Sequence, residues 1–428
     1  MNLYVGIDLG TSGCRATAID DAATIQGAWA VELPPGTRRP GIHEQVAQRW
    51  WDAVQRLLEA LPPQLPRHAV RGIAVDGTAA TVLLTDSNGT PLTPALVYDD
   101  TRSIPQALNI AAVAPPDSPA LGATSGLAKL LWLREQPAAV RAHHVLHAAD
   151  WIAGRLQGAY GTSDVNHCLK MGYDPVSDRW PDWLDHLGIP REWLPRVLTP
   201  GTVQGQLAPE VANAFRLPAG VRVVTGTTDS TAAFLATGAR RPGEAVTSLG
   251  STLVLKVIAA RPVSAARYGI YSQPLGEQWL VGGASNSGGA VLRQFFTQAQ
   301  LDAMTPRLVP ERPTGLDYYP LPARGERFPI ADPALEPRLA PRPADALIFF
   351  QGLLEGIAGI EARGYRLLAE LGAPTPIAVY TVGGGAGNRP WRQIRARLLG
   401  VPLLEAACLD AAYGAALLAR RGSGLGPK

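Results

Sequence analysis

The strongest constraint on the fold of this chain is a strand, a turn of small residues and a second strand that occur once in each half. Near the N-terminus, residues 3–7 are apolar and lead into Asp8–Gly13 (Asp-Leu-Gly-Thr-Ser-Gly), after which Arg15–Ile19 has the alternation of a strand. Residues 245–256 repeat this arrangement around Ser248–Thr252 (Ser-Leu-Gly-Ser-Thr). Because a repeated supersecondary unit indicates a duplicated architecture, we expect two lobes with one such hairpin in each.

Both lobes are expected to be of the α/β class. A chain of 428 residues is too long for one ordinary hydrophobic core, so two domains of roughly 200 residues are expected. Amphipathic helical patterns, such as residues 46–61 and 348–371, alternate with short apolar strands and Pro- and Gly-rich turns. A new strand begins at residue 221 and leads into a Gly/Thr turn. We therefore expect a first lobe over residues 1–224 and a second over 225–428.

Charge and composition argue against several classes of protein. The 39 basic and 36 acidic residues give a net charge of +3, and the basic residues are scattered, so no nucleic-acid partner is expected. Three cysteines, Cys14, Cys168 and Cys408, form no Cys-x-x-Cys pair, which favours a reducing compartment. The N-terminus lacks a signal-peptide pattern, and a proline and two acidic residues interrupt the most apolar tract, 398–419. We expect a cytoplasmic protein without a membrane span.

The two turns between the paired strands have the composition of phosphate-binding loops. In Asp8–Gly13, small residues let backbone N–H groups approach an oxyanion, and Thr11 and Ser12 add hydroxyl donors. The Asp8 carboxylate ends a strand, where it could hold Mg²⁺ through water. The alternative is an ordinary tight hairpin. Ser248–Thr252 would hold the other end of a polyphosphate, although alone it is a weak signal.

Asp229 is the candidate general base. It follows a strand and a Gly/Thr turn and precedes a helical run, a place where a carboxylate could accept a proton from a hydroxyl that attacks a phosphoryl group. The alternative is that Asp229 is only a helix N-cap, for which Thr227 and Thr228 are rival candidates. The residues alone do not choose between these roles.

A third glycine-rich segment, Gly383–Asn388, follows the strand 379–382. Its flat backbone could support a planar base, with Asn388 able to hydrogen-bond and Trp391 able to stack. A loop packed tightly against a helix would also explain the three consecutive glycines. The segment lacks the G-x-G-x-x-G spacing of a dinucleotide fingerprint. The chain also has no Walker-type loop and no protein-kinase motif set.

Taken together, these segments resemble the motifs of the FGGY carbohydrate kinases, which belong to the actin and Hsp70 superfamily. The motifs, in order, are Gly6–Ser12, Thr225–Ser230, Ser248–Thr252 and Gly383–Asn388. Lys129–Trp132 also resembles part of a family signature, from which Gly126 departs. Further segments are similar to the short cyanobacterial and plant D-ribulose kinase, or xylulose-kinase-like, subgroup: Asp76–Thr78, Ala149–Trp151, Ser285–Gly289 and Gly315–Pro322.

The resemblance implies a two-lobed actin/Hsp70-like (ribonuclease H-like) α/β fold, with ATP, Mg²⁺ and a sugar in the cleft between the lobes. It implies catalysis by Asp229 and Asp8, with Asp8 also serving the metal. The implied nucleotide-binding residues are Gly10, Thr11, Gly250, Ser251, Gly384, Gly385, Asn388 and Trp391. The implied sugar contacts are Asp8, Ser12, Gly13, Arg15, Thr78, Ala79 and Asp229.

The sugar itself is the least determined part of this hypothesis. Ala79 stands where the cyanobacterial relatives carry a serine, and losing one neutral hydrogen bond is worth only about 0.5–1.5 kcal/mol. The segment lacks the Gln and His of xylulokinases, whereas Asp100 and Arg102 resemble a xylulokinase-like W-x-D-x-R segment. We expect phosphorylation of D-ribulose to D-ribulose 5-phosphate. The alternatives are a D-xylulose kinase and, in a different class, an actin-like ATP switch that transfers nothing to a sugar.

Overall fold

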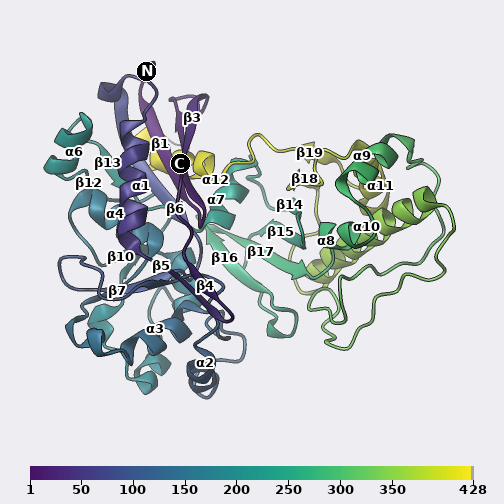
Figure 1. The fold of residues 1–428 in the computed structure, drawn as a ribbon, viewed down its shortest axis with the longest axis horizontal. Helices are drawn as coiled ribbons and strands as arrows, with labels where there is room; N and C mark the ends of the chain where they lie inside the picture. Colours follow the sequence, from purple (N-terminus) through teal and green to yellow (C-terminus); the bar gives the residue numbers. More distant parts are fainter. Residues whose placement is uncertain (426–428) are drawn as a thin grey trace. The chain divides into compact units, whose positions relative to one another are not determined.

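A computed structural model of the protein describes residues 1–425 and divides the chain into two compact units (Figure 1). The first contains Met1–Ala236 together with the chain from Asp410 onward, and the second contains Thr237–Leu409. This division differs from the boundary expected at 224/225, because helix α7 (Asp229–Ala236) packs in the first unit against helix α12 (Ala411–Arg420). The packing is close: a Cβ at Gly414 of α12 would lie 1.9 Å from the Ala232 carbonyl oxygen.

The first unit is built on a six-stranded sheet with the order β12-β13-β6-β1-β2-β3. Its strands, in chain order, are β1 (Leu3–Leu9), β2 (Gly13–Ile19), β3 (Ile25–Glu32), β6 (Val70–Gly77), β12 (Val203–Gln206) and β13 (Arg222–Val224). All seven residues of β1 are buried, and β1 pairs antiparallel with β2 and parallel with β6. The expected N-terminal hairpin is therefore confirmed, and its turn lies where β1 ends.

Helices cover both faces of this sheet. One face packs against α1 (Ala47–Glu59), α4 (Ala148–Gln157) and α6 (Pro209–Phe215), whose apolar side chains form the main core with β1 and β6. The other face packs against α12, which brings residues near the C-terminus next to Tyr4 and Ile19. The N-terminal strand is thus held between helices from distant parts of the sequence.

A second sheet of the first unit has the order β4-β5-β8-β7-β9. Its strands are β4 (Thr37–Arg39), β5 (Ile42–Gln45), β7 (Val82–Thr85), β8 (Ala95–Leu96) and β9 (His144–His147). Helix α3 (Gly126–Arg134) packs on it, and α2 (Ile104–Ala111) packs against α3. The parallel pair β10 (Thr162–Asp164) and β11 (Arg196–Leu198) and the short helix α5 (Val165–Cys168) complete the unit.

The second unit repeats the hairpin arrangement on its own six-stranded sheet, ordered β16-β17-β15-β14-β18-β19. Its strands are β14 (Glu244–Leu249), β15 (Leu253–Ala259), β16 (Tyr271–Leu275), β17 (Gln278–Ser285), β18 (Ala378–Val382) and β19 (Leu403–Glu405). The pair β14/β15 is antiparallel and β14/β18 is parallel, as for β1/β2 and β1/β6. The expected duplication of one hairpin per lobe is confirmed.

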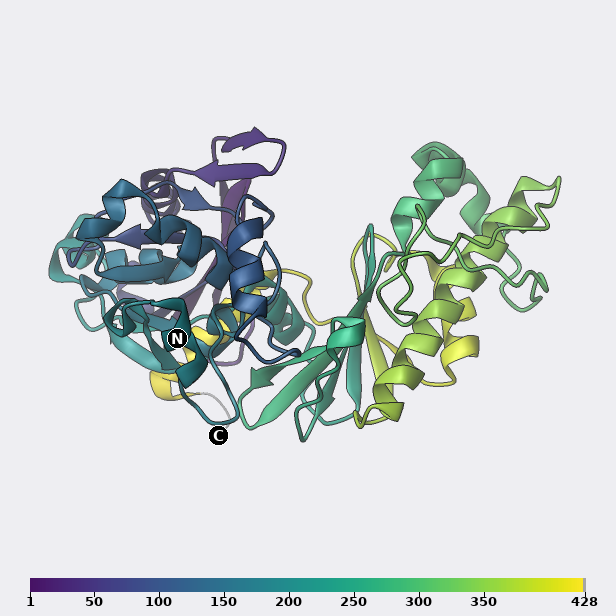
Figure 2. The same cartoon turned by 90° about the horizontal axis from the view of Figure 1, so that it is seen from below.

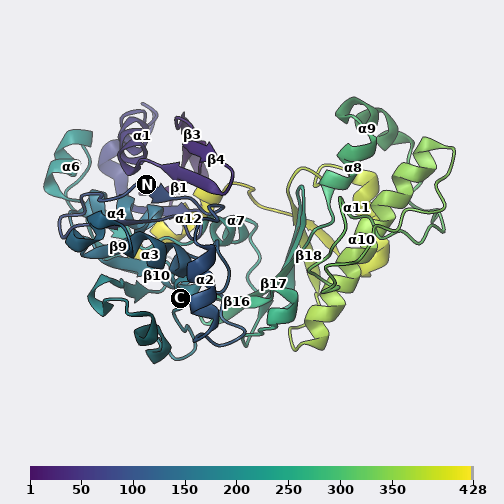
Figure 3. The ribbon, with the colours of Figure 1, turned by 60° about the horizontal axis from the view of Figure 1, so that its bottom comes forward.

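The long helix α10 (Ala346–Glu370) lies along the sheet of the second unit, beside α11 (Arg389–Leu399) (Figures 2 and 3). Its buried face packs Phe349, Leu353 and Ile357 into the core of this unit. Two short helices, α8 (Gly289–Phe295) and α9 (Gln298–Met304), follow β17. Within residues 1–425, no helix combines the length and apolar character needed to cross a bilayer.

Candidate active site

Three aspartates lie at one edge of the first unit's sheet: Asp8 and Asp76 in the last two residues of β1 and β6, and Asp229 after the turn that follows β13. Strands β1 and β6 are parallel and in register, so Asp8 lies opposite Asp76. Gly77, the next residue of β6, forms a parallel bridge with Thr228, and its N–H donates to the Thr227 carbonyl. Asp229 follows directly. Because β13 is also parallel to β6, all three carboxylates stand at carboxyl ends of neighbouring strands.

Glycine is required where the turn before Asp229 approaches the sheet. A Cβ at Gly226 would lie 1.8 Å from the carbonyl oxygen of Val75, closer than any side chain can pass. The Gly/Thr turn is therefore held against β6 by main-chain contacts. The sequence pattern that marked Asp229 thus has a direct structural cause.

Asp229 is the first residue of α7, so Thr228 takes the N-cap position of this helix. The Thr228 carbonyl accepts from the N–H groups of Thr231 and Ala232, as the residue before a helix does. The Asp229 carboxylate accepts locally, from the Ser230 N–H at 2.6 Å, and the side chain is half-buried. The N-cap position of α7 thus belongs to one of the rival residues, and a proton-accepting role for Asp229 stays a prediction.

The Asp8 and Asp76 carboxyl groups perturb each other. Burial raises the pKa of Asp8, while hydrogen bonds from Asp76 and Arg15 oppose the rise; Arg15 Nη1 donates to Asp8 Oδ2 at 3.2 Å. Burial, followed by the charges of Asp8 and Asp229, raises the pKa of Asp76 well above its ordinary value. Asp76 is fully buried, and neither of its oxygens accepts a hydrogen bond from an N–H or hydroxyl donor of the described residues. It is the natural holder of a proton shared with Asp8.

The other predicted sugar-contacting residues lie in two turns of the same unit. Ser12, Gly13 and Arg15 belong to the β1–β2 turn and the start of β2, where the Gly10 N–H donates to the Gly13 carbonyl at 3.0 Å. Thr78 and Ala79 follow the end of β6, and Thr78 Oγ1 lies 2.6 Å from Thr81 Oγ1. The structure therefore brings both turns to the edge of the sheet that carries Asp8. Gly10 and Thr11, predicted to bind phosphate, are in the first of these turns.

Asp100 and Arg102 form a buried polar network. The Asp100 carboxylate is fully buried and accepts from the His43 N–H and from the Arg102 guanidinium. Arg102 also donates to Glu44 at 2.7 Å and lies over the Trp132 ring at 4.7 Å. These groups join β5, the turn after β8 and helix α3. The Asp100 oxygens are thus occupied by protein donors.

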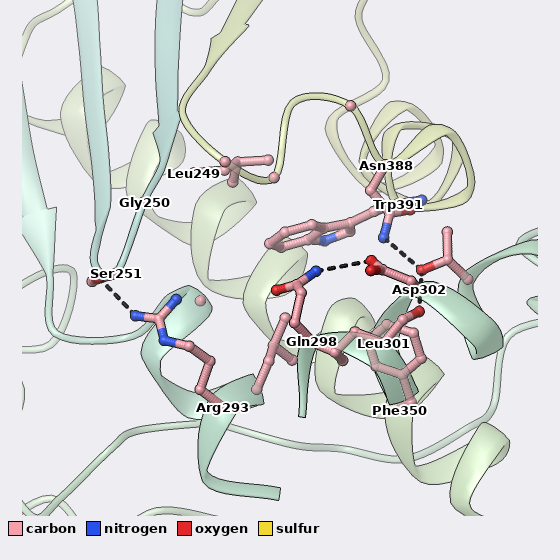
Figure 4. A pocket seen from close by; sticks show the side chains of 16 residues that line it. Leu249, Gly250, Ser251, Arg293, Gln298, Leu301, Asp302, Phe350, Asn388 and Trp391 are labelled. Carbon is pink, nitrogen blue, oxygen red and sulfur yellow. Dashed lines mark hydrogen bonds between the residues drawn. The ribbon is translucent and has the colours of Figure 1, made fainter. Parts of the chain in front are cut away.

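The second unit contains a cavity of about 580 Å³ at the ends of β14 and β18 (Figure 4). All the nucleotide-binding residues predicted for this lobe line it: Gly250, Ser251, Gly384, Gly385, Asn388 and Trp391. Asn388 is the N-cap of α11, where its Oδ1 accepts from the Trp391 N–H at 2.9 Å. The Trp391 ring is 3% exposed, and its Nε1 donates to the Leu354 carbonyl. Both residues therefore line the cavity and also hold its wall in place through these hydrogen bonds.

Glycine occurs at these three consecutive positions for different reasons. Gly383 has a φ of +88°, and a Cβ there would lie 2.8 Å from the Leu249 carbonyl oxygen. A Cβ at Gly385 would lie 2.6 Å from the Trp391 ring. At Gly384, a Cβ would meet nothing within 4 Å. Protein packing thus explains two of the glycines, and only Gly384 presents an open backbone surface to a ligand.

One wall of the cavity comes from α8 and α9, where no motif of the sequence extends beyond Gly289, the first residue of α8. Arg293 donates to Ser251 Oγ at 2.8 Å, beside the loop predicted to hold phosphate. Asp302 accepts from Gln298 Nε2 on the side of the cavity where Asn388 and Trp391 lie (Figure 4). Among the lining residues, Arg293 alone is basic and Asp302 alone is acidic. This charge distribution suits a ligand with a phosphate end and an end rich in N–H or hydroxyl donors.

Two groups of acidic residues in the first unit are candidates to hold a magnesium ion, and the aspartates at the sheet edge suit it better than the group around Asp150. Asp8 and Asp229 offer carboxylate oxygens as ligands, whereas Asp76, whose pKa is raised by burial, is suited to share its proton with Asp8. The potential ligand atoms of Asp150, Asp164 and His167 lie within 4.8 Å of one another. However, Asp150 closes the capping box of α4 and Asp164 caps α5, so those carboxylates already serve the backbone.

Comparison with known proteins assigns both units to one family. Residues 3–236 match the model of the N-terminal domain, and residues 245–422 that of the C-terminal domain, of the FGGY family of carbohydrate kinases. A xylulose kinase of Escherichia coli (strain K12) is 26% identical, over 94% of this chain and 86% of that protein. A gluconokinase of Bacillus subtilis (strain 168) is 22% identical, over 95% and 86%.

Solved structures agree with this assignment. A xyloylose kinase from Brucella ovis superimposes with a TM-score of 0.88 at 26% identity, covering 99% of this chain and 90% of that one. The family match and this likeness confirm the expected α/β, actin- and Hsp70-like fold class.

Proposed function

This chain belongs to the FGGY family of carbohydrate kinases, and from that premise we propose that it transfers the γ-phosphoryl group of ATP to a ketopentose, with D-ribulose as the first candidate. The observation that carries the proposal is the convergence of Asp8, Asp76 and Asp229 at one sheet edge, beside two turns rich in small and hydroxyl residues. A nucleotide-sized, charge-polarised cavity in the second unit supports ATP as the phosphoryl donor.

In the proposed reaction, Asp229 is the general base. Its carboxylate takes the proton of a sugar hydroxyl as that oxygen forms a bond to the γ-phosphorus, while the bond from the γ-phosphorus to the β,γ-bridging oxygen breaks and ADP leaves. Asp8, oriented by Arg15, would hold Mg²⁺, which supplies charge neutralisation to the phosphates. Exclusion of water during phosphoryl transfer would make the sugar, not solvent, the acceptor.

Nucleotide binding is assigned to the cavity of the second unit. The Ser251 N–H and the Arg293 guanidinium suit the phosphates beside Gly250, whose own N–H donates to the Thr252 carbonyl, and the open backbone at Gly384 suits the face of the base. Asn388 and Trp391 fix the shape of this wall. Gly10 and Thr11 of the first unit are proposed to contact phosphate through the β1–β2 turn.

D-Xylulose is the second candidate substrate, because a curated relative with 26% identity and nearly full coverage is a xylulose kinase. D-Ribulose is favoured by the Asp76–Thr78 segment, which is similar to the D-ribulose kinase subgroup and lacks the Gln and His of xylulokinases. Ala79 supplies no hydroxyl to either sugar. The discriminating contacts would then come from the other proposed sugar-contacting groups, such as Ser12, Arg15 and Thr78.

The test is a coupled assay of ADP release with MgATP and equal concentrations of D-ribulose, L-ribulose, D-xylulose, L-xylulose, ribitol, glycerol and D-gluconate. The highest kcat/KM for D-ribulose would support the proposal. A preference for D-xylulose would move the assignment to the second candidate. ATP hydrolysis that no sugar accelerates would contradict sugar phosphorylation and favour the ATP-switch alternative.

A further inference from the structure

Lys129 is a fully buried lysine whose ammonium group reaches two main-chain carbonyls. It lies on α3, is 0% exposed, and its Nζ donates to the Ala80 carbonyl at 2.8 Å and to the Val97 carbonyl at 2.7 Å. Burial lowers the pKa of this lysine to about 7, against the opposing charge of Asp100. Burying an ionisable group costs desolvation free energy, so a buried lysine indicates a structural or functional role.

The Ala80 carbonyl belongs to the 78–81 turn of the proposed sugar site, and the Val97 carbonyl belongs to the 97–102 turn, which contacts it. Ala80 directly follows Thr78 and Ala79, and it is one of four described non-glycine residues with a positive φ, here 60°. In that conformation its carbonyl points to Lys129 and not into a strand ladder. Thr81 Oγ1 accepts from the Tyr98 N–H at 3.1 Å. Lys129 and Thr81 therefore bind the 78–81 turn to the 97–102 turn.

The 78–81 turn is also linked to the segment that carries the proposed base. Gly77 is bridged to Thr228, and its N–H donates to the Thr227 carbonyl, one turn before Asp229. A shift of residues 78–80 would move the sugar-facing groups relative to Asp229 without altering Asp229 itself. Because Ala79 has no hydroxyl, the turn can bind a sugar only through Thr78 and its main chain, which makes the backbone position decisive.

The partners of Lys129 differ from those of the fully buried arginine of this chain. Only four of the 39 Lys and Arg residues are lysines, and among those that the structure describes Lys129 is the buried one. The fully buried arginine, Arg395, instead meets the Glu361 carboxylate with two nitrogens, at 2.7 Å each. A planar guanidinium fits a carboxylate, whereas a compact ammonium fits two converging carbonyls. Each cation thus matches the chemistry of its partner.

We propose that Lys129 is a positioning residue for the sugar: by holding the Ala80 and Val97 carbonyls, it sets the geometry of the sugar-binding turn and hence the KM for sugar. It touches neither ATP nor the transferred phosphoryl group. The inference rests on the proposed function, since it assigns Thr78 and Ala79 to the sugar site.

The test compares Lys129→Met, which keeps the side-chain length and removes all donors, with Lys129→Gln, which retains two N–H donors. The control is Lys170→Met, the same substitution in the neighbouring segment Leu169–Met171. For Lys129→Met we expect the KM for sugar to rise about 10- to 100-fold, because two charge-assisted hydrogen bonds are lost. The kcat and the KM for ATP should stay within about threefold, and Lys129→Gln should fall between.

A second measurement covers the case in which Lys129→Met folds poorly or no sugar is turned over. Amide hydrogen exchange, followed at residues 78–82 and 97–103, should become faster in Lys129→Gln and remain unchanged in Lys170→Met. An unchanged KM for sugar, a matching fall in kcat, or the same effect in Lys170→Met would overturn the inference. If no sugar accelerates the wild type, the proposed function fails, and unchanged exchange in Lys129→Gln would then reject the positioning role separately.

Discussion

Asp8 and Asp76 lie opposite each other on neighbouring parallel strands, and two carboxyl groups so placed ionise together only at high cost. Asp8 keeps a partner in Arg15, whereas Asp76 is fully buried among described groups that offer its oxygens no N–H or hydroxyl. The difference in environment separates two chemically identical side chains. Asp8 is suited to carry charge toward a cation, and Asp76 to carry a proton.

Replacing Asp76 with Asn should therefore stabilise the protein at pH 8. The pKa of Asp76 is raised in the fold, so as pH rises above about 4 the unfolded chain ionises this group and the folded chain does not, which costs stability. The gain in Asp76→Asn should appear as a Tm about 2–4 °C higher at pH 8, and should shrink toward zero as pH falls to 4. Thermal unfolding across this pH range checks it, and a lower Tm at pH 8 would contradict the assignment.

Asp229→Ala should lower kcat by roughly 10²- to 10⁴-fold, the usual contribution of a positioned general base. Thr228 takes the N-cap position of α7, so the variant should fold with a Tm close to that of the wild type. Affinity for ATP, measured by calorimetry, should be nearly unchanged. Near-normal turnover in a folded variant would remove Asp229 from the mechanism.

At the scale of elements, the glycine-rich loop between β18 and α11 separates packing from binding. Gly383 and Gly385 are held by contacts with Leu249 and Trp391, whereas Gly384 faces open space. The same loop thus supports the cavity wall at two positions and presents bare backbone at a third. Substitutions at adjacent positions can therefore distinguish the two roles.

Gly384→Ala should weaken ATP binding by about tenfold with an unchanged Tm, because the added methyl group occupies the surface proposed for the base. Gly385→Ala, the matched control, should instead destabilise the protein by about 1–3 kcal/mol through its clash with Trp391. Calorimetric titration with ATP and thermal unfolding measure the two effects. Unaltered ATP affinity in Gly384→Ala would place the base elsewhere.

At the scale of the whole molecule, the proposed chemistry is divided between two units, each with its own sheet and core. The proposed sugar-binding groups and the base belong to the first unit, and the nucleotide cavity is lined entirely by residues of the second. The first unit is made of two separate segments of the chain, because α12 packs against β1. A ligand that needs only one unit should stabilise only that unit.

Adenosine, which lacks phosphates, should slow amide exchange in residues 383–391 and leave Asp8–Gly13 and residues 77–81 unchanged. At 100 times its Kd, the expected stabilisation of the binding region is about 2.7 kcal/mol. Exchange measured by mass spectrometry resolves these segments. Protection of Asp8–Gly13 by adenosine would contradict the division of roles.

The sequence by itself determined those features that depend on neighbouring residues. Turn chemistry and strand alternation mark Asp8–Gly13, Ser248–Thr252 and Gly383–Asn388, and their order suffices to predict the duplicated α/β fold and the candidate base. Gly226 shows why such a pattern is visible in the sequence: a main-chain contact with β6 leaves no room for a side chain, so the fold imposes glycine at this position. Asp229 is accordingly a candidate base on the sequence pattern alone, and its role stays a prediction.

Only the tertiary structure decided the features that depend on strand register and long-range packing. The parallel register of β1 and β6 makes Asp76 a partner of Asp8, and α8 and α9 bring Arg293 and Asp302 into the nucleotide cavity. Lys129 matched a signature, but its two carbonyl partners lie 49 and 32 residues away in the sequence. No window of sequence contains such pairs, because burial and hydrogen bonding between distant segments exist only once the chain has folded.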